Sequence, residues 1–133
     1  SYLLATLSTA EKNSILLHAA ETLRKQEQAI LEENKKDVEE ARKRGIKESL
    51  IDRLALSEKR IAAMAEGLEK IAVLDDPIGE ILGMKKLPNG LLIGQKRVPF
   101  GVIGIIFEAR PNVTADAYGL CLKSGNAVIL RGG

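Results

Sequence analysis

The sequence has little with which to build a crosslink, a metal site or a stacking surface for bases. Its 133 residues include one cysteine, one histidine, no tryptophan and four other aromatic residues. A single cysteine, Cys121, excludes an internal disulfide and favours a reducing compartment, so we expect a cytoplasmic protein. His18 has no second histidine, cysteine or carboxylate at metal-ligand spacing, so we expect no metal site. The few aromatic residues and the lack of a basic stripe disfavour nucleic acid as a partner.

Long apolar runs are also missing. No stretch approaches the roughly 20 apolar residues that span a bilayer, and we see no secretory leader, so no membrane association is expected. Residues 1–76 carry 13 Lys and Arg against 15 Asp and Glu, whereas residues 77–133 carry seven against three. An anionic ligand would meet a better field in the second part, although solvated surface lysines explain the count equally well.

Residues 1–76 have the pattern of amphipathic helices. Ser8 and Glu11 have the spacing of a capping box, which satisfies backbone N–H groups at the start of a helix. Apolar residues then recur at helical spacing: Ile15, Leu16, Ala19, Ala20 and Leu23. The Asp76–Pro77 pair ends the helical pattern, because proline disfavours helical geometry in the residue before it.

Two further helices are expected within this part. One ends near Gly45, with Asn34 as a break inside it, and the other begins at Ser57 as its cap. The buried side of the second is predicted to contain Ile61, Met64, Ala65, Leu68 and Ile71. Residues 80–98 then predict a β-hairpin, because Asn89 and Gly90 between apolar segments are a strong two-residue turn signal.

The remainder predicts a strand, a helix and a second strand. Residues 102–107 (VIGIIF) are apolar and β-branched, as expected of a strand buried on both faces. A helix is expected over residues 113–123, with Val113, Ala117, Leu120 and Cys121 on its apolar side, and a second buried strand over residues 127–130. Such a unit builds a parallel sheet, of which two strands are only a part.

Polar residues follow both strands, where ligands bind in open α/β sheets. The first loop is Glu108 to Asn112, and the second is Arg131, Gly132 and Gly133. The first loop is also explained without a ligand if Asn112 caps the helix and Glu108 pairs with Arg110. No glycine-rich phosphate loop follows a strand, so a standard dinucleotide fingerprint is missing. Cys121 lies mid-helix on the apolar side and is expected to pack as a small hydrophobe.

Several motifs resemble gamma-glutamyl phosphate reductases, a family of the aldehyde dehydrogenase superfamily. Residues 98–114 (VPFGVIGIIFEARPNVT) are similar to the signature that opens the catalytic half of these enzymes, and residues 122–133 (LKSGNAVILRGG) match the segment after it. Shorter segments in the same register are also similar to the family: residues 33–37, 52–54 and 76–79. The resemblance covers nearly the whole chain.

The resemblance implies an α/β fold with three segments. Residues 1–76 would be an N-terminal helical segment, residues 77–98 a β-hairpin that serves as an oligomerisation arm, and residues 99–133 the start of a Rossmann-like cofactor-binding sheet of the aldehyde dehydrogenase fold. The chain would then match roughly the N-terminal third of an enzyme that forms homo-oligomers.

The resemblance also implies a reaction, the NADPH-dependent reduction of L-glutamyl 5-phosphate to L-glutamate 5-semialdehyde in proline biosynthesis. A cysteine thiolate would attack the acyl phosphate, phosphate would leave, and hydride would reduce the thioester. The family's nucleophile lies beyond residue 133, so the chain alone is expected to be inactive. Alternative interpretations are another aldehyde dehydrogenase relative, the reductase half of a bifunctional kinase–reductase, or a non-enzymatic helical interaction module.

Site residues follow from the same resemblance. The superfamily's oxyanion-hole asparagine corresponds to Asn112 by residue type but to Arg110 by counting, and we favour Asn112, with Arg110 binding a substrate anion. Cofactor contacts are implied for Ile106, Phe107, Arg131, Gly132 and Gly133. Arg131 stands where the superfamily has a lysine near the adenosine ribose, and a guanidinium there suits the 2′-phosphate of NADPH.

Overall fold

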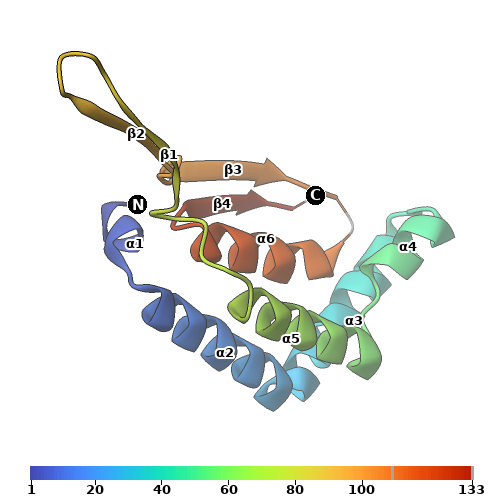
Figure 1. The fold of residues 1–133 in the computed structure, drawn as a ribbon. Helices are drawn as coiled ribbons and strands as arrows, with labels where there is room; N and C mark the ends of the chain where they lie inside the picture. Colours follow the sequence, from blue (N-terminus) through green and yellow to red (C-terminus); the bar gives the residue numbers. More distant parts are fainter. Residues whose placement is uncertain (109, 133) are drawn as a thin grey trace.

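The structure, a computed structural model, describes residues 1–108 and 110–132. It contains a helical layer, an exposed hairpin and a parallel strand–helix–strand unit, arranged as in Figure 1. The elements are α1 (Tyr2–Thr6), α2 (Thr9–Lys25), α3 (Glu27–Lys43), α4 (Glu48–Leu54), α5 (Glu58–Ala72), β1 (Ile81–Lys86), β2 (Leu92–Lys96), β3 (Val102–Ile106), α6 (Pro111–Lys123) and β4 (Ala127–Arg131). The α/β class expected from the sequence is confirmed.

Local signals set the starts of the two longest core helices. Ser8 Oγ accepts a hydrogen bond from Glu11 N at 3.3 Å, and the Glu11 carboxylate accepts one from Ser8 N at 2.8 Å, which confirms the capping box. The Ser8 hydroxyl also donates to this carboxylate at 2.7 Å, and this bond and the one from Ser8 N hold the pKa of Glu11 below its ordinary value. At the start of α5, Ser57 Oγ accepts from Arg60 N, and the predicted buried side of this helix is confirmed.

The predicted break at Asn34 is wrong, because α3 continues through it without interruption. The Asn34 side chain is buried and bonds to the segment between α4 and α5. Its Nδ2 donates to Leu54 O at 3.0 Å, and its Oδ1 accepts from Leu56 N at 2.7 Å. Asn34 therefore connects α3 to the end of α4 and the segment after it, and it does not interrupt its own helix.

The core lies where α2, α5 and α6 pack together. Its buried members are Leu16, Ala20, Ala65, Leu68, Ile71, Ala72 and Leu122. Helix α6 lies between the α2–α5 pair and the two-stranded sheet (Figure 1). Leu120, expected on the apolar side of α6, is exposed instead, and the buried residues of this helix include its neighbours Gly119 and Cys121.

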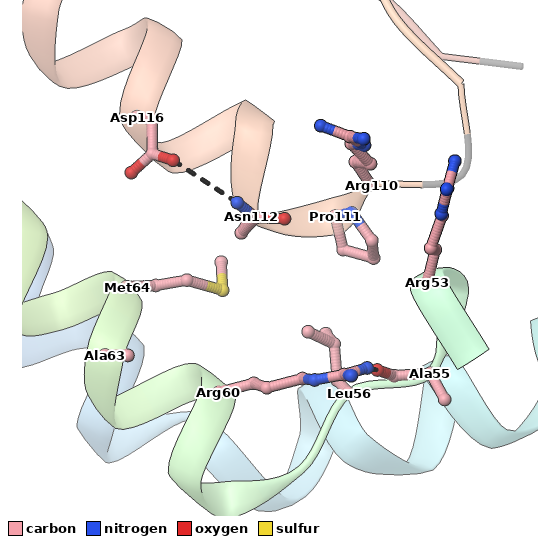
Figure 2. Close-up of a pocket in the computed structure, with 10 residues that line it drawn as sticks. All are labelled: Arg53, Ala55, Leu56, Arg60, Ala63, Met64, Arg110, Pro111, Asn112 and Asp116. Carbon is pink, nitrogen blue, oxygen red and sulfur yellow. Dashed lines mark hydrogen bonds between the residues drawn. The ribbon is translucent and has the colours of Figure 1, made fainter.

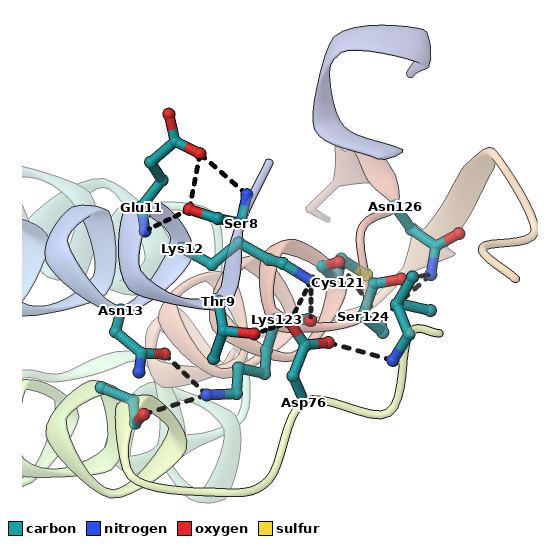
Figure 3. Close-up of polar contacts among 12 residues, drawn as sticks. Ser8, Thr9, Glu11, Lys12, Asn13, Asp76, Cys121, Lys123, Ser124 and Asn126 are labelled. Atoms are coloured by element: carbon teal, nitrogen blue, oxygen red, sulfur yellow. Dashed lines mark hydrogen bonds and ion pairs between the residues drawn. The ribbon is translucent and has the colours of Figure 1, made fainter. Parts of the chain in front are cut away.

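A network of buried polar side chains lies at one end of this core, where the start of α2 meets the ends of α5 and α6 (Figure 3). Lys12 on α2 is 1% exposed, and its Nζ lies 2.6 Å from Asp76 Oδ2. The same amine donates to Lys123 O at the end of α6, at 3.2 Å. In return Lys123 Nζ donates to Asn13 Oδ1 at 2.6 Å and to Ala72 O at 2.9 Å. Lys12 on α2 thus bonds to the end of α6, and Lys123 on α6 bonds back to the start of α2.

Asp76 receives further hydrogen bonds in the turn after α5. Its carboxylate accepts from Thr9 Oγ1 at 2.8 Å and from Ile78 N at 3.0 Å. Burial by itself raises the pKa of Asp76, but the bonds from Lys12, Ile78 and Thr9 outweigh it and hold that pKa below its ordinary value. The helix-ending Asp76–Pro77 pair is therefore also a fixed point of the core.

The hairpin is confirmed, although its turn differs from the expected one. β1 and β2 pair antiparallel, and the loop between Leu87 and Leu91 has three residues, where the Asn89–Gly90 signal predicted two. Gly90 adopts φ 87°, the left-handed conformation that completes a three-residue loop. Every residue of both strands is exposed, and the hairpin projects away from the helices (Figure 1).

β3 and β4 form the predicted parallel pair, with Ile106 opposite Arg131 at the carboxyl ends. The expectation of strands buried on both faces is wrong for these residues. Along β3 the side chains alternate between exposed and half-buried, and Ile106 and Ile129 are 84% and 66% exposed. The pattern has a physical reason: α6 packs against this pair, and no second described layer covers its other face.

None of the described helices combines the length and the apolar character that a bilayer crossing requires.

Replacing Asp76 with Asn should lower the free energy of unfolding by about 3 kcal/mol at pH 7, because Lys12 loses its buried counter-charge. The folded pKa of Asp76 lies below the unfolded value of about 3.9. Its stabilisation is therefore complete above that value and is lost as the pH falls through the folded pKa. In urea unfolding, the difference in free energy of unfolding between the two proteins should be constant at about pH 6–7 and should become smaller in acid.

A matched Glu33→Gln variant, which breaks an exposed pair with Lys36, should change the free energy of unfolding by less than about 0.5 kcal/mol. A stability difference between the wild type and Asp76→Asn that does not change with pH would contradict this role of the Asp76 carboxylate.

Two mid-helix glycines provide a second, internally controlled test. A Cβ at Gly119 would lie 2.7 Å from Leu68 Cδ2 and 2.8 Å from Ile71 Cδ1, whereas one at Gly67 would meet its nearest atom at 3.5 Å. Gly67→Ala should stabilise the fold by up to about 1 kcal/mol through helix propensity. Gly119→Ala should instead destabilise it by about 1–2 kcal/mol, because the core is already filled. Equal effects of the two substitutions on thermal unfolding would rule out close packing of α6.

Candidate functional site

A cleft lined by three arginines lies at the N-terminal end of α6. Its volume is about 520 Å³, and it faces the end of α4 and the first turns of α5 (Figure 2). Arg53 comes from α4, Arg60 from α5 and Arg110 from the residue that precedes α6. Asp116 is the one acidic residue among the lining residues, which are Arg53, Ala55, Leu56, Arg60, Ala63, Met64, Arg110, Pro111, Asn112 and Asp116. The cleft therefore carries a net positive charge.

Helix α6 starts two residues earlier than the sequence pattern suggested, and this changes the place of Asn112. Pro111 is the first helical residue, where its fixed φ is favourable and its missing N–H costs nothing. Asn112 is the second, so it does not cap the helix, and the capping alternative is wrong. Its Nδ2 donates to Asp116 Oδ2 at 3.3 Å, one turn along the helix. This bond leaves the second hydrogen of the amide nitrogen available to a ligand.

The alternative pairing of Glu108 with Arg110 is not observed. Among the described residues no ion pair joins them, and they face different hollows. Arg110 lines the arginine cleft, whereas Glu108 borders a groove beside α3 and α4. Two of the sequence-predicted residues, Arg110 and Asn112, are thus brought together in one cleft, and Glu108 is not.

Arg60 has a different environment from the other two arginines. Its Nη1 donates to the carbonyl oxygens of Asp52 and Ala55, which stand at the C-terminal end of α4. Its Nη2 also lies 3.7 Å from the Asp52 carboxylate. Cations are favourable at this end of a helix, because the last carbonyl groups have no partner within it. Arg60 therefore holds the connection between α4 and α5 in place.

The second strand-end site lies at the carboxyl edge of β3 and β4. Phe107 N donates to Arg131 O at 3.0 Å, which continues the ladder beyond Ile106. The Arg131 side chain is exposed, and a Cβ built on Gly132 would meet only the Phe107 ring, at 3.9 Å. This edge is open enough for the backbone to approach a nucleotide, with one guanidinium beside it. Gly133, also predicted as a cofactor contact, lies outside the described residues.

The chain's single thiol is unsuited to nucleophilic chemistry. Cys121 is buried in the last turn of α6, and burial raises the pKa of its thiol. The packing role expected for it is confirmed. His18 is exposed on α2, and the described residues contain no group of three or more His, Cys, Asp and Glu side chains that could hold a metal ion.

The sequence analysis singled out neither Arg53 nor Arg60, and of the two Arg53 is the functional candidate. Residues 52–54, which contain Arg53, are one of the segments similar to the family, but nothing in that motif marks the arginine as a site residue. No spacing rule connects it to Arg110, which is more than fifty positions away along the chain. Only the packing of α4 and α5 against the start of α6 brings these guanidinium groups together.

Fold and site together define a class of protein. The chain is an α/β protein in which polar groups gather at the carboxyl ends of parallel strands, the position at which open α/β sheets bind their ligands. No family model matches the chain. Individual relatives do match it, and over nearly its whole length.

The chain is 65% identical over 130 residues to the gamma-glutamyl phosphate reductase of Thermoanaerobacter sp. and 60% identical to that of Carboxydothermus hydrogenoformans. Each match covers 98% of this chain and 31% of the relative. A crystal structure of gamma-glutamyl phosphate reductase from Thermotoga maritima superposes with a TM-score of 0.95 at 50% identity, over 98% of this chain and 32% of that one. The Saccharomyces cerevisiae structure of the same name gives 0.92 at 38% identity.

The resemblance found in the sequence motifs is therefore confirmed, and the chain is homologous to gamma-glutamyl phosphate reductase. It spans about a third of the length of the relatives it matches.

Proposed function

We propose that this chain is part of an enzyme that reduces L-glutamyl 5-phosphate to L-glutamate 5-semialdehyde, with NADPH as reductant and phosphate as leaving group, in proline biosynthesis. The observation that carries the proposal is the 65% identity to a gamma-glutamyl phosphate reductase over 98% of the chain. The strand-end sites support it, because one offers a cationic cleft for an anionic substrate and the other an open edge for a nucleotide.

The residues of the cleft have distinct parts in this reaction. Asn112 is the oxyanion donor: the bond to Asp116 orients its amide, and its remaining N–H stabilises the negative charge on the substrate's carbonyl oxygen. Arg110, at the N-terminal end of α6, binds an anionic group of the substrate, where the helix dipole adds to the favourable field. The acyl phosphate and carboxylate of the substrate suit such a site.

The cofactor residues are those at the edge of β3 and β4. Ile106, Phe107 and Gly132 form the surface against which the nucleotide lies, and the Arg131 guanidinium takes the 2′-phosphate with paired hydrogen bonds. Gly133 follows them in sequence. When bound, NADPH supplies the hydride that reduces the acyl group.

The proposal also names the source of the nucleophile and the part of this chain that assembles the parent protein. The nucleophilic thiolate comes from outside this chain, since Cys121 is buried with a raised pKa, and the 133 residues alone are therefore inactive. The exposed hairpin of β1 and β2 serves as an oligomerisation arm in a cytoplasmic homo-oligomer, because its unpaired edges and apolar side chains offer a second copy a surface to extend.

The parent protein that contains this chain should be assayed in the reverse direction, with L-glutamate 5-semialdehyde, NADP⁺ and inorganic phosphate. NADPH should form only when phosphate is present, since the acyl group must be transferred to it. The isolated 133-residue chain is the matched control and should give no turnover. Oxidation that proceeds equally well without phosphate would instead indicate another aldehyde dehydrogenase activity.

The cofactor assignment predicts an effect specific to one nucleotide. In the parent enzyme Arg131→Ala should raise the KM for NADPH about tenfold or more, because a charge-assisted contact with the 2′-phosphate is lost. The KM for NADH, which lacks that phosphate, should change little. Lys43→Ala, which removes an exposed cation from α3, is the control and should leave both constants unchanged. An equal rise for both nucleotides would remove the 2′-phosphate role from Arg131.

A further inference from the structure

We propose that the arginine cleft recognises the amino-acid end of the substrate, with Arg53 and Arg110 binding its α-carboxylate and Asp116 binding its α-ammonium group. The inference rests on the proposed function and deepens it, because it names the residues that select an α-amino acid over other acyl groups. Arg53 and Asp116 are the new assignments.

Arg53 and Arg110 are the arginines of the cleft whose side chains are not engaged. Arg60 is bonded to the carbonyl groups at the end of α4, whereas among the described residues no side-chain hydrogen bond or ion pair is made by Arg53 or Arg110. Figure 2 shows the Arg53 side chain extending from the end of α4 toward the segment that carries Arg110. Two like charges that line one cleft repel each other, so the arrangement is stabilised by an anion between them.

The surroundings of these two guanidinium groups favour a carboxylate. The first turn of α6, a 13-residue helix, adds the positive end of its dipole on the same side of the cleft. Guanidinium groups match the planar carboxylate with paired hydrogen bonds. Asp116 is the only acidic residue among the described lining residues, and it lies one helical turn further along α6.

Asp116 supplies the second half of the recognition. Its carboxylate accepts one long hydrogen bond, 3.3 Å from Asn112 Nδ2, and so retains most of its capacity to accept others. An α-amino acid carries a carboxylate and an ammonium group on the same carbon. A cleft with arginines on one side and a single carboxylate nearby is complementary to that pair of charges.

Apolar side chains complete the cleft. Leu56, Met64 and Pro111 line it between the charged groups, and they offer a surface for the methylene groups of a glutamyl chain. The shared contact between Asp116 and Asn112 then links recognition to chemistry, because the residue that holds the ammonium group also orients the oxyanion donor.

Three aldehydes distinguish the contact with the α-carboxylate from the contact with the α-ammonium group when they are assayed with the full-length enzyme. L-Glutamate 5-semialdehyde has both α-groups, 5-oxopentanoate lacks the ammonium, and 4-aminobutanal lacks the carboxylate. Arg53→Gln should raise the KM about tenfold or more for the first two and leave 4-aminobutanal unchanged. Asp116→Asn should raise the KM for L-glutamate 5-semialdehyde and 4-aminobutanal and leave 5-oxopentanoate unchanged. Arg53→Lys should recover part of the loss, since it keeps the charge without the paired geometry.

Arg42→Gln, on the exposed surface of α3, is the matched control and should change no KM. An equal change for all three aldehydes in Arg53→Gln, or no change for any, would overturn the inference. Calorimetric titration of the full-length protein with L-glutamate, glutarate and 4-aminobutyrate gives a readout independent of turnover. L-Glutamate should bind most tightly, and Arg53→Gln should weaken L-glutamate and glutarate alone. If the wild type lacks phosphate-dependent turnover, the proposed function fails, but this titration still decides the inference: equal binding of the three compounds overturns it.

Discussion

The buried ion pair between Lys12 and Asp76 is the contact on which the arrangement of the other elements depends. A charge in the interior is costly unless every group around it is paired, and here the partners come from distant parts of the chain. Lys12 joins the start of α2 to the turn after α5 and to the end of α6, and Lys123 returns bonds to α2 and α5. Both amines bond to groups on more than one of these helices, so the network helps to hold their relative placement in the core.

Because the network holds the C-terminal end of α6 in place, it also affects where the N-terminal end of this helix lies. With its C-terminal end held by the lysines and Gly119 pressed against α5, the helix presents its first turn to α4 and α5. Asn34 on α3 holds the end of α4 and the segment that follows it, through its bonds to Leu54 and Leu56. The arginine cleft is therefore built on elements whose backbones are already held, as a site that must position charged groups requires.

Much of the local structure could be predicted because its causes are local. The capping box at Ser8, the cap at Ser57 and the hairpin signal at Asn89–Gly90 each depend on residues a few positions apart. The errors have long-range causes. Asn34 looked like a helix break because asparagine competes for backbone bonds, yet its partners are about twenty residues away. The strands of the parallel unit looked buried on both faces, but burial depends on which layers are present.

By itself the sequence determined where the longer helices, the hairpin and the strands form, but it did not indicate the short helices α1 and α4. Its motifs determined the resemblance to gamma-glutamyl phosphate reductases, since motifs and local patterns are both properties of contiguous residues. It also placed Arg110 and Asn112 after the first strand of the sheet. Only the tertiary structure decided that Arg53 and Asp116 join them, that Arg60 is engaged elsewhere and that Glu108 faces another groove. The reason is physical: the charges that share a cleft are selected by the packing of helices far apart in the chain, and no local pattern encodes that packing.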